Sequence, residues 1–99
     1  MLIVVYAFYS ERAIKQAEII KSYLLYKFTQ REVDHFYELL TLFENLVITF
    51  PELYRKSSSN KKLHRAVLSK QLSVFYKHSK SKITVMSVLD NRMNPKKWP

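Results

Sequence analysis

The residues that could do chemistry lie mostly in the second half of the chain, and nearly all of them are cations. Residues 51–99 hold twelve Lys/Arg against two carboxylates, Glu52 and Asp90, whereas residues 1–50 hold five Lys/Arg against six Asp/Glu. Lys and Arg can hold a phosphodiester and stabilise the charge that develops in its transition state, and a histidine or lysine can move protons. This asymmetry predicts a surface that attracts nucleic acid or an acidic protein.

Other kinds of site are poorly supported. His35, His64 and His78 do not have the spacing of metal ligands, and the chain contains no cysteine, so no metal site is expected. It also contains no glycine, which excludes a glycine-rich phosphate loop. The two carboxylates of the second half are too far apart in sequence to suggest a paired-carboxylate mechanism. No cofactor is therefore implied.

The first half predicts one strand and two helices. Residues 2–8 are rich in β-branched and aromatic side chains, which is typical of a strand. Ser10 is a typical N-cap for the helix that follows. Residues 29–32 (TQRE) form a capping-box pattern that predicts the start of a second helix, which is expected to end before Pro51. The second helix has the most regular apolar stripe in the sequence, formed by Val33, Phe36, Leu40, Phe43, Val47 and Phe50.

Three short β-rich segments follow, over residues 62–69, 72–78 and 82–89. Their connections are so short that consecutive strands must be antiparallel. The predicted order is β-α-α-β-β-β in a single domain over residues 1–99. We expect an α+β fold in which the N-terminal strand and a helical hairpin pack on one face of a mainly antiparallel sheet. The pattern does not fix the partner of the first strand.

Alternation along the strand over residues 62–69 divides its side chains between two faces. One face carries Lys62, His64 and Ala66. The other is expected to contact the helices and carries Leu63, Arg65 and Val67, so Arg65 must lie at an edge or reach solvent.

Tyr54 and Tyr76 add aromatic rings that could stack on nucleic-acid bases. The alternative for Tyr76 is packing in the core. We favour packing, because buried aromatic side chains are common.

With these elements in order, the sequence resembles the RelE/ParE superfamily, the toxins of bacterial type II toxin–antitoxin modules, which include plasmid-stabilisation proteins. The resemblance covers essentially the whole chain: a first strand, a helical hairpin ending in FPELYRKSS, a strand KLHRAVLSKQ and the strand pair in LSVFYKHSKSKITVMSVLDNRMNP. That last segment is similar to the family's tyrosine-containing strand, polar turn and apolar strand that ends in an arginine-containing tail.

The resemblance implies one of two mechanisms. RelE-like members cut messenger RNA in the decoding site of the ribosome with clustered Lys/Arg and often a C-terminal Tyr or His, whereas ParE-like members lack this set and poison DNA gyrase. Arg92 matches the arginine at the end of the family's last strand, and no Tyr or His follows it. The surroundings of Arg92 are closer to the ParE-like tail, although Asp90 stands where many of those relatives have a histidine.

The favoured hypothesis is a ParE-like toxin that inhibits bacterial growth by binding DNA gyrase without catalysis. The alternatives are a RelE-like ribosome-dependent endonuclease and a non-toxic basic module that binds nucleic acid. For the nuclease, the catalytic candidates are Arg92, Arg65, Lys62 and Lys70. The candidates for binding a target or nucleic acid are Lys61, Lys62, His64, Arg65, Lys70, Tyr76, Arg92, Lys96 and Lys97.

The resemblance also implies a partner, a cognate antitoxin with an acidic and partly disordered segment that folds onto the toxin. The apolar opening of the chain is too short to span a bilayer and lacks the pattern of a signal peptide. The absence of cysteine fits a reducing compartment. A cytoplasmic protein without a membrane partner is therefore expected.

Overall fold

The computed structural model describes residues 6–93 and contains the helices and strands in the predicted order. They are β1 (Tyr6–Tyr9), α1 (Glu11–Lys27), α2 (Gln30–Thr49), β2 (His64–Val67), β3 (Leu72–His78) and β4 (Lys82–Asp90). The predicted α+β fold is confirmed. Of the strand expected over residues 2–8, only the part from Tyr6 onward lies within the described residues. Within them, no helix combines the length and the apolar character needed to cross a membrane.

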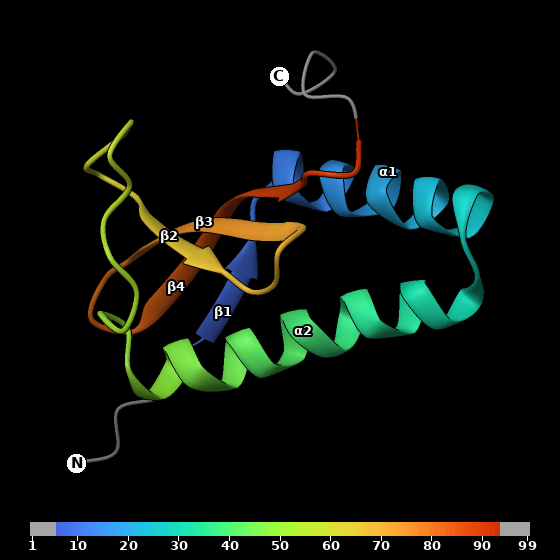
Figure 1. Cartoon of the computed structure of the whole chain (residues 1–99). Coiled ribbons are helices and arrows are strands. Elements are labelled where there is room, and N and C mark those ends of the chain that lie inside the picture. Colours follow the sequence, from blue (N-terminus) through green and yellow to red (C-terminus); the bar gives the residue numbers. More distant parts are fainter. Residues whose placement is uncertain (1–5, 94–99) are drawn as a thin grey trace.

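The strands form one sheet in the order β1-β4-β3-β2 (Figure 1). β2, β3 and β4 form the predicted antiparallel meander. The first strand, whose partner the sequence left open, pairs in parallel with the last one, from Tyr6 beside Lys82 to Tyr9 beside Val85. β4 is thus an inner strand that joins the two ends of the chain.

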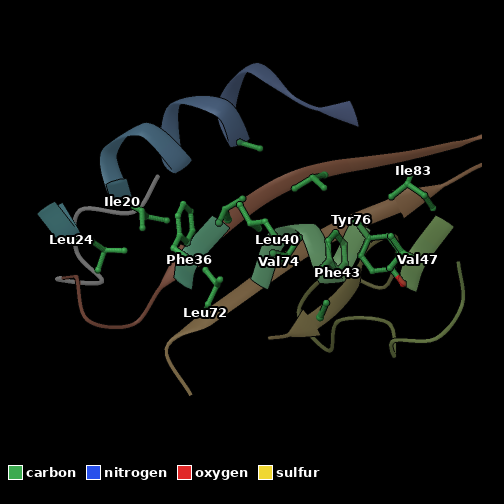
Figure 2. Packing of buried hydrophobic residues seen from close by; sticks show 14 of the residues in the cluster. Ile20, Leu24, Phe36, Leu40, Phe43, Val47, Leu72, Val74, Tyr76 and Ile83 are labelled. Carbon is green, nitrogen blue, oxygen red and sulfur yellow. The ribbon is translucent and has the colours of Figure 1, made fainter. Parts of the chain in front are cut away.

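Helix α2 covers one face of the sheet, and the core lies between them (Figure 2). The predicted stripe of α2 is buried from Val33 to Val47, but Phe50 at its end is exposed. From the sheet side, Leu72, Val74 and Tyr76 of β3 meet this stripe. Burial of these side chains is the main stabilising contribution to the fold, at about 1.5–3 kcal/mol for each large aliphatic residue.

Helix α1 closes an edge of β4 that β1 is too short to cover. β1 ends at Tyr9, whereas β4 continues five residues beyond the matching position, Val85. Ser10 continues the pairing with its backbone N–H to the Val85 carbonyl and its hydroxyl to the Met86 carbonyl. The same hydroxyl accepts from the N–H of Ala13, so the predicted N-cap is confirmed.

Six residues after Ser10, the side chain of Gln16 takes over as the partner of β4. Its Oε1 accepts from the backbone N–H of Val88 at 2.8 Å and from the hydroxyl of Ser87 at 3.1 Å. Gln16 is 3% exposed, and its Nε2 has no hydrogen-bond partner among residues 6–93. A buried backbone N–H without an acceptor is costly, which explains a glutamine at this otherwise apolar position.

β4 also carries a β-bulge. Phe75 of β3 lies beside Ser87 and Tyr76 lies beside Val85, so Met86 is the extra residue on β4. The bulge shifts the alternation of the strand and allows both Val85 and Val88 to be buried on the core face.

The second helix begins after Thr29, as predicted, but without capping-box bonds: Thr29 makes no side-chain cap bond, and the Glu32 carboxylate binds Arg92. The face assignment of β2, by contrast, was wrong. In β2, His64 and Ala66 face the core while Arg65 and Val67 are exposed, which is the reverse of the predicted assignment. A one-residue shift along a strand exchanges its two faces. A charged Arg65 on the face predicted to contact the helices was therefore the sign that the assignment was reversed.

The role of Gln16 leads to a stability prediction. Replacing Gln16 with leucine leaves the Val88 N–H buried without an acceptor, so Gln16→Leu is expected to lower the free energy of unfolding by about 1–3 kcal/mol. Urea denaturation measures this change, and amide hydrogen exchange at Val88 should accelerate. The control is Gln30→Leu at an exposed site, expected to change stability by less than about 0.5 kcal/mol. Equal stability of both variants would show that Gln16 does not hold β4.

Candidate binding groove

The face of the sheet opposite α2 contains a groove of about 610 Å³, which we call the sheet groove. It is bordered by the start of α1 and by the loop before β2, and its floor is formed by β3 and β4. Its lining residues are Arg12, Ser59, Asn60, Lys62, Leu63, Phe75, Lys77, Met86, Ser87 and Leu89. It therefore combines three cations with a largely apolar floor and has no carboxylate in its lining.

The bulge and the loop turn explain the shape of the sheet groove. Because Met86 is the extra residue of the bulge, Met86 and its neighbour Ser87 both line the groove, where a regular strand would direct only one of them. In the loop, the side-chain oxygen of Asn60 accepts from the backbone N–H of Lys62 at 3.0 Å and fixes the turn that brings Lys62 to the rim.

The cations of the rim differ in their surroundings. Arg12 is already engaged in an interaction of its own. Lys62 and Lys77 are exposed, and neither forms an ion pair with a carboxylate among residues 6–93. Two side chains of like charge beside an apolar floor produce a local positive potential, so an anion bound between them is favoured.

Two further cations of this sheet face lie over aromatic rings. The guanidinium of Arg65 is 5.9 Å from the ring centre of Phe75, and the ammonium of Lys82 is 5.0 Å from that of Phe8. These are cation–π distances, which hold the two charges close to the sheet surface.

His64 and Tyr76, two of the predicted binding residues, are buried on the core face. Tyr76 is fully buried, and its hydroxyl donates to the Pro51 carbonyl at 2.8 Å. The His64 ring stacks on Tyr76 with 5.0 Å between ring centres, and its Nδ1 donates to the Tyr54 carbonyl at 2.7 Å. Neither ring is available for stacking on a base, and the alternative of core packing for Tyr76 is the one that the structure supports. Both rings instead hold the loop over residues 51–63 against the sheet.

Arg92 lies outside the sheet groove, in a network at the tip of the helical hairpin. Its guanidinium binds both carboxylate oxygens of Asp90, at 3.0 and 2.7 Å, and also Oε2 of Glu32 at 3.0 Å. It lies 5.3 Å from the ring centre of Phe28, and its backbone carbonyl accepts from the hydroxyl of Tyr23. Hydrogen bonds to Asp90 raise the pKa of Arg92 above its ordinary value.

This network, the Arg92 clasp, joins the end of β4 to both helices. Asp90 is fully buried, so its charge requires the arginine, and three of the five side-chain N–H groups of Arg92 already donate to carboxylates. A role of Arg92 in target binding stays a prediction, but its present contacts are structural.

The four candidates for a nuclease site are not gathered in one place. Lys62 is in the sheet groove and Arg65 is on the same sheet face, whereas Lys70 is exposed in the turn between β2 and β3. Arg92 contacts the hairpin tip, which lies across the molecule from the loop of Lys62 (Figure 1). Of the remaining binding candidates, Lys61 is exposed beside Lys62, and Lys96 and Lys97 are outside the described residues.

Sequence reasoning selected neither Arg12 nor Lys77 as a binding residue. Arg12 is fifty positions before Lys62, and only the closure of β4 by α1 brings it to the groove. Lys77 had a usable signal, because it alternates with the buried Tyr76 and must face away from the core.

The burial of Tyr76 leads to a prediction of pH dependence. Burial raises the pKa of Tyr76 to about 12 from an ordinary value of 10.0. The native state therefore holds this proton more tightly than the unfolded state, and the associated stability is complete below pH 10 and lost as the pH rises toward 12. The loss attributable to this residue is about 2–3 kcal/mol. Thermal unfolding from pH 9 to 12 should show a shallower decline for Tyr76→Phe; parallel declines would contradict it.

The Arg92 clasp leads to a third prediction. Arg92→Ala leaves the buried Asp90 carboxylate without its partner and is expected to lower stability by about 3 kcal/mol. Arg92→Lys keeps the charge but loses the two-pronged geometry, so an intermediate loss is expected. Chemical denaturation of these variants is compared with Arg31→Ala, which removes an exposed arginine from the first turn of α2. If the Arg92→Ala protein is as stable as the Arg31→Ala protein, Arg92 does not stabilise the fold.

Comparison with known proteins gives a match in structure and none in sequence. No protein-family model matches the chain, and no curated protein matches it. A chain of the solved structure titled "Chromosomal ParDE TA system from P. aeruginosa" superposes with a TM-score of 0.73, covering 90% of this chain and 98% of that chain at 6% identity. The likeness at this identity is one of fold. The chain thus has the fold of a component of a ParDE toxin–antitoxin system, and the fold implied by the RelE/ParE resemblance is confirmed.

Proposed function

We propose that the protein is the toxin of a type II toxin–antitoxin module, of the ParE-like kind, and that it inhibits bacterial growth by binding DNA gyrase. The observation that carries this proposal is the fold shared with a chain of a ParDE system over nearly the full length of both chains. The basic sheet face adds support, because a toxin needs a surface for an acidic partner that neutralises it.

The chemistry of the sheet groove favours binding over catalysis. Cleavage of RNA requires groups that remove and donate protons. The lining of the sheet groove includes no histidine, tyrosine or carboxylate, so only its lysines could fill that role. His64 and His78 instead lie with their rings 5.2 Å apart, and His64 is buried beside Tyr76 on the core face. The ribosome-dependent nuclease is therefore the second candidate, supported only by the groove's cations.

The target is tested by pulse-labelling after induced expression in a bacterium. Thymidine incorporation is expected to fall before methionine incorporation, because gyrase inhibition blocks replication while existing messages are still translated. Purified protein is then expected to inhibit supercoiling by purified gyrase. The control is the same gene with an early stop codon.

Other outcomes point to the other candidates. If methionine incorporation collapses first, the ribosome is the target and the gyrase proposal fails. If neither label changes and the isolated protein binds DNA or RNA with steep salt dependence, it is a non-toxic nucleic-acid-binding module.

A further inference from the structure

Helix α2 carries a second apolar stripe besides the one in the core, which we call the flank stripe. Its members are Leu39, Leu42 and Leu46 of the helix, the C-cap residue Phe50, and Leu53 in the turn that follows. The N–H of Leu53 bonds to the Phe50 carbonyl, so this turn continues directly from the helix end. Leu39 is half-buried, whereas the other four are 43–60% exposed. A row of exposed apolar side chains marks an interaction surface.

The flank stripe lies on the side of α2 that is turned away from α1. The side that meets α1 includes Tyr37, which lines a hollow together with Ala17. Leu46 follows Tyr37 by nine residues, so at about 100° per residue the two point to opposite sides of the helix. Successive members of the stripe are three or four residues apart, which keeps them on one flank. Figure 1 shows α2 at the margin of the molecule, where such a flank can reach a partner.

The spacing of the flank stripe is symmetric about Leu46. Leu42 and Phe50 lie four residues to either side of it, and Leu39 and Leu53 lie seven. A second copy placed antiparallel, with Leu46 beside Leu46, therefore brings Leu42 beside Phe50 of that copy and Leu39 beside its Leu53. Each apolar side chain meets an apolar partner, as an interface with twofold symmetry requires. The symmetric spacing favours a second copy of this chain over an unrelated partner.

The charges around the stripe are complementary in the same arrangement. In a protein of net charge +9, α2 is acidic, with four carboxylates and one arginine. Glu38 flanks the start of the stripe, whereas Arg55 and Lys56 follow its end, and all three are exposed. An antiparallel pair places the acidic start of each stripe near the basic end of the other. A parallel pair would bring like charges together, so the antiparallel pair is favoured.

We propose that two copies of the protein associate through the flank stripe, as an antiparallel pair of α2 helices with the twofold axis at Leu46. One helix pair is a small interface, so the dimer is weak, with a Kd on the order of 10 μM. The sheet groove lies on the face of the sheet opposite α2, so dimerisation leaves it open and one dimer presents two grooves. This dimer is independent of the proposed function.

The association is measured by analytical ultracentrifugation of the purified protein from about 2 to about 200 μM, which spans the expected Kd. The average mass is expected to rise from 11.9 kDa toward twice that value. Leu46→Glu places two carboxylates together at the axis and is expected to raise the Kd at least about tenfold. The matched control is Leu25→Glu on α1, which adds the same charge at an equally exposed leucine and should change the Kd less than about threefold.

A charge pair tests the antiparallel register. Leu42→Lys and Phe50→Glu are each expected to weaken the dimer, because each leaves a charge beside an apolar side chain. The double variant, Leu42→Lys with Phe50→Glu, places each lysine beside a glutamate of the other copy and should recover at least about fivefold of the loss. Both positions are exposed, so the fold is expected to be retained, and circular dichroism of each variant checks this.

Three results would overturn the proposal. A wild-type protein that stays monomeric throughout this range would show that the stripe is not self-complementary and serves a different partner. Equal weakening by Leu46→Glu and Leu25→Glu would reduce the association to a general effect of surface charge. A double variant weaker than both single variants would exclude the antiparallel register. Because none of these measurements involves growth inhibition, a failed dimer leaves the toxin proposal intact, and a protein that dimerises without affecting either label in cells refutes the toxin alone.

Discussion

The structure depends on how the edge of β4 is closed. β1 pairs with the first half of β4 only, and a buried inner strand cannot leave the N–H and carbonyl groups of its second half without partners. Ser10 and Gln16 supply those partners from the start of α1. The direction of α1 follows from this constraint, because Ser10 at its start and Gln16 six residues later both bond to the strand, so the helix must run beside it. The chain therefore changes from strand to helix without losing contact with β4.

The positions of the sheet groove and of the Arg92 clasp both follow from the placement of α1 beside β4. The start of α1 brings Arg12 to the rim of the sheet groove, and the far end brings Tyr23 and Phe28 to Arg92. The bulge at Met86 is the second determinant, since it widens the groove floor and also sets the phase in which Asp90 is buried. A change in the placement of α1 or in the bulge would alter the sheet groove and the Arg92 clasp together, so the two regions are not independent.

The sequence predicts what local periodicity and short connections determine. The stripe of α2, the Ser10 cap and the bounds of β3 agree with the structure, because each depends on neighbours within a few residues. The parallel pairing of β1 with β4 could not be predicted, since it joins segments over seventy positions apart. The phase of β2 was missed because a histidine looks polar in isolation, whereas His64 is stabilised by Tyr54 and Tyr76 from elsewhere in the chain. The bulge did leave a sign, the change of apolar spacing from two to three after Val85.

Arg92 and the groove lysines differ in whether the protein itself supplies their opposite charges. Arg92 has its opposite charges supplied by the protein, so it stabilises the fold and adds little to the field outside. Lys62 and Lys77 have no such partner in the described part of the chain, and in a protein of net charge +9 their mutual repulsion disfavours the compact state. An anionic occupant relieves that repulsion and stabilises the native state by mass action. The repulsion between Lys62 and Lys77 is therefore a physical reason for an anion to bind between them.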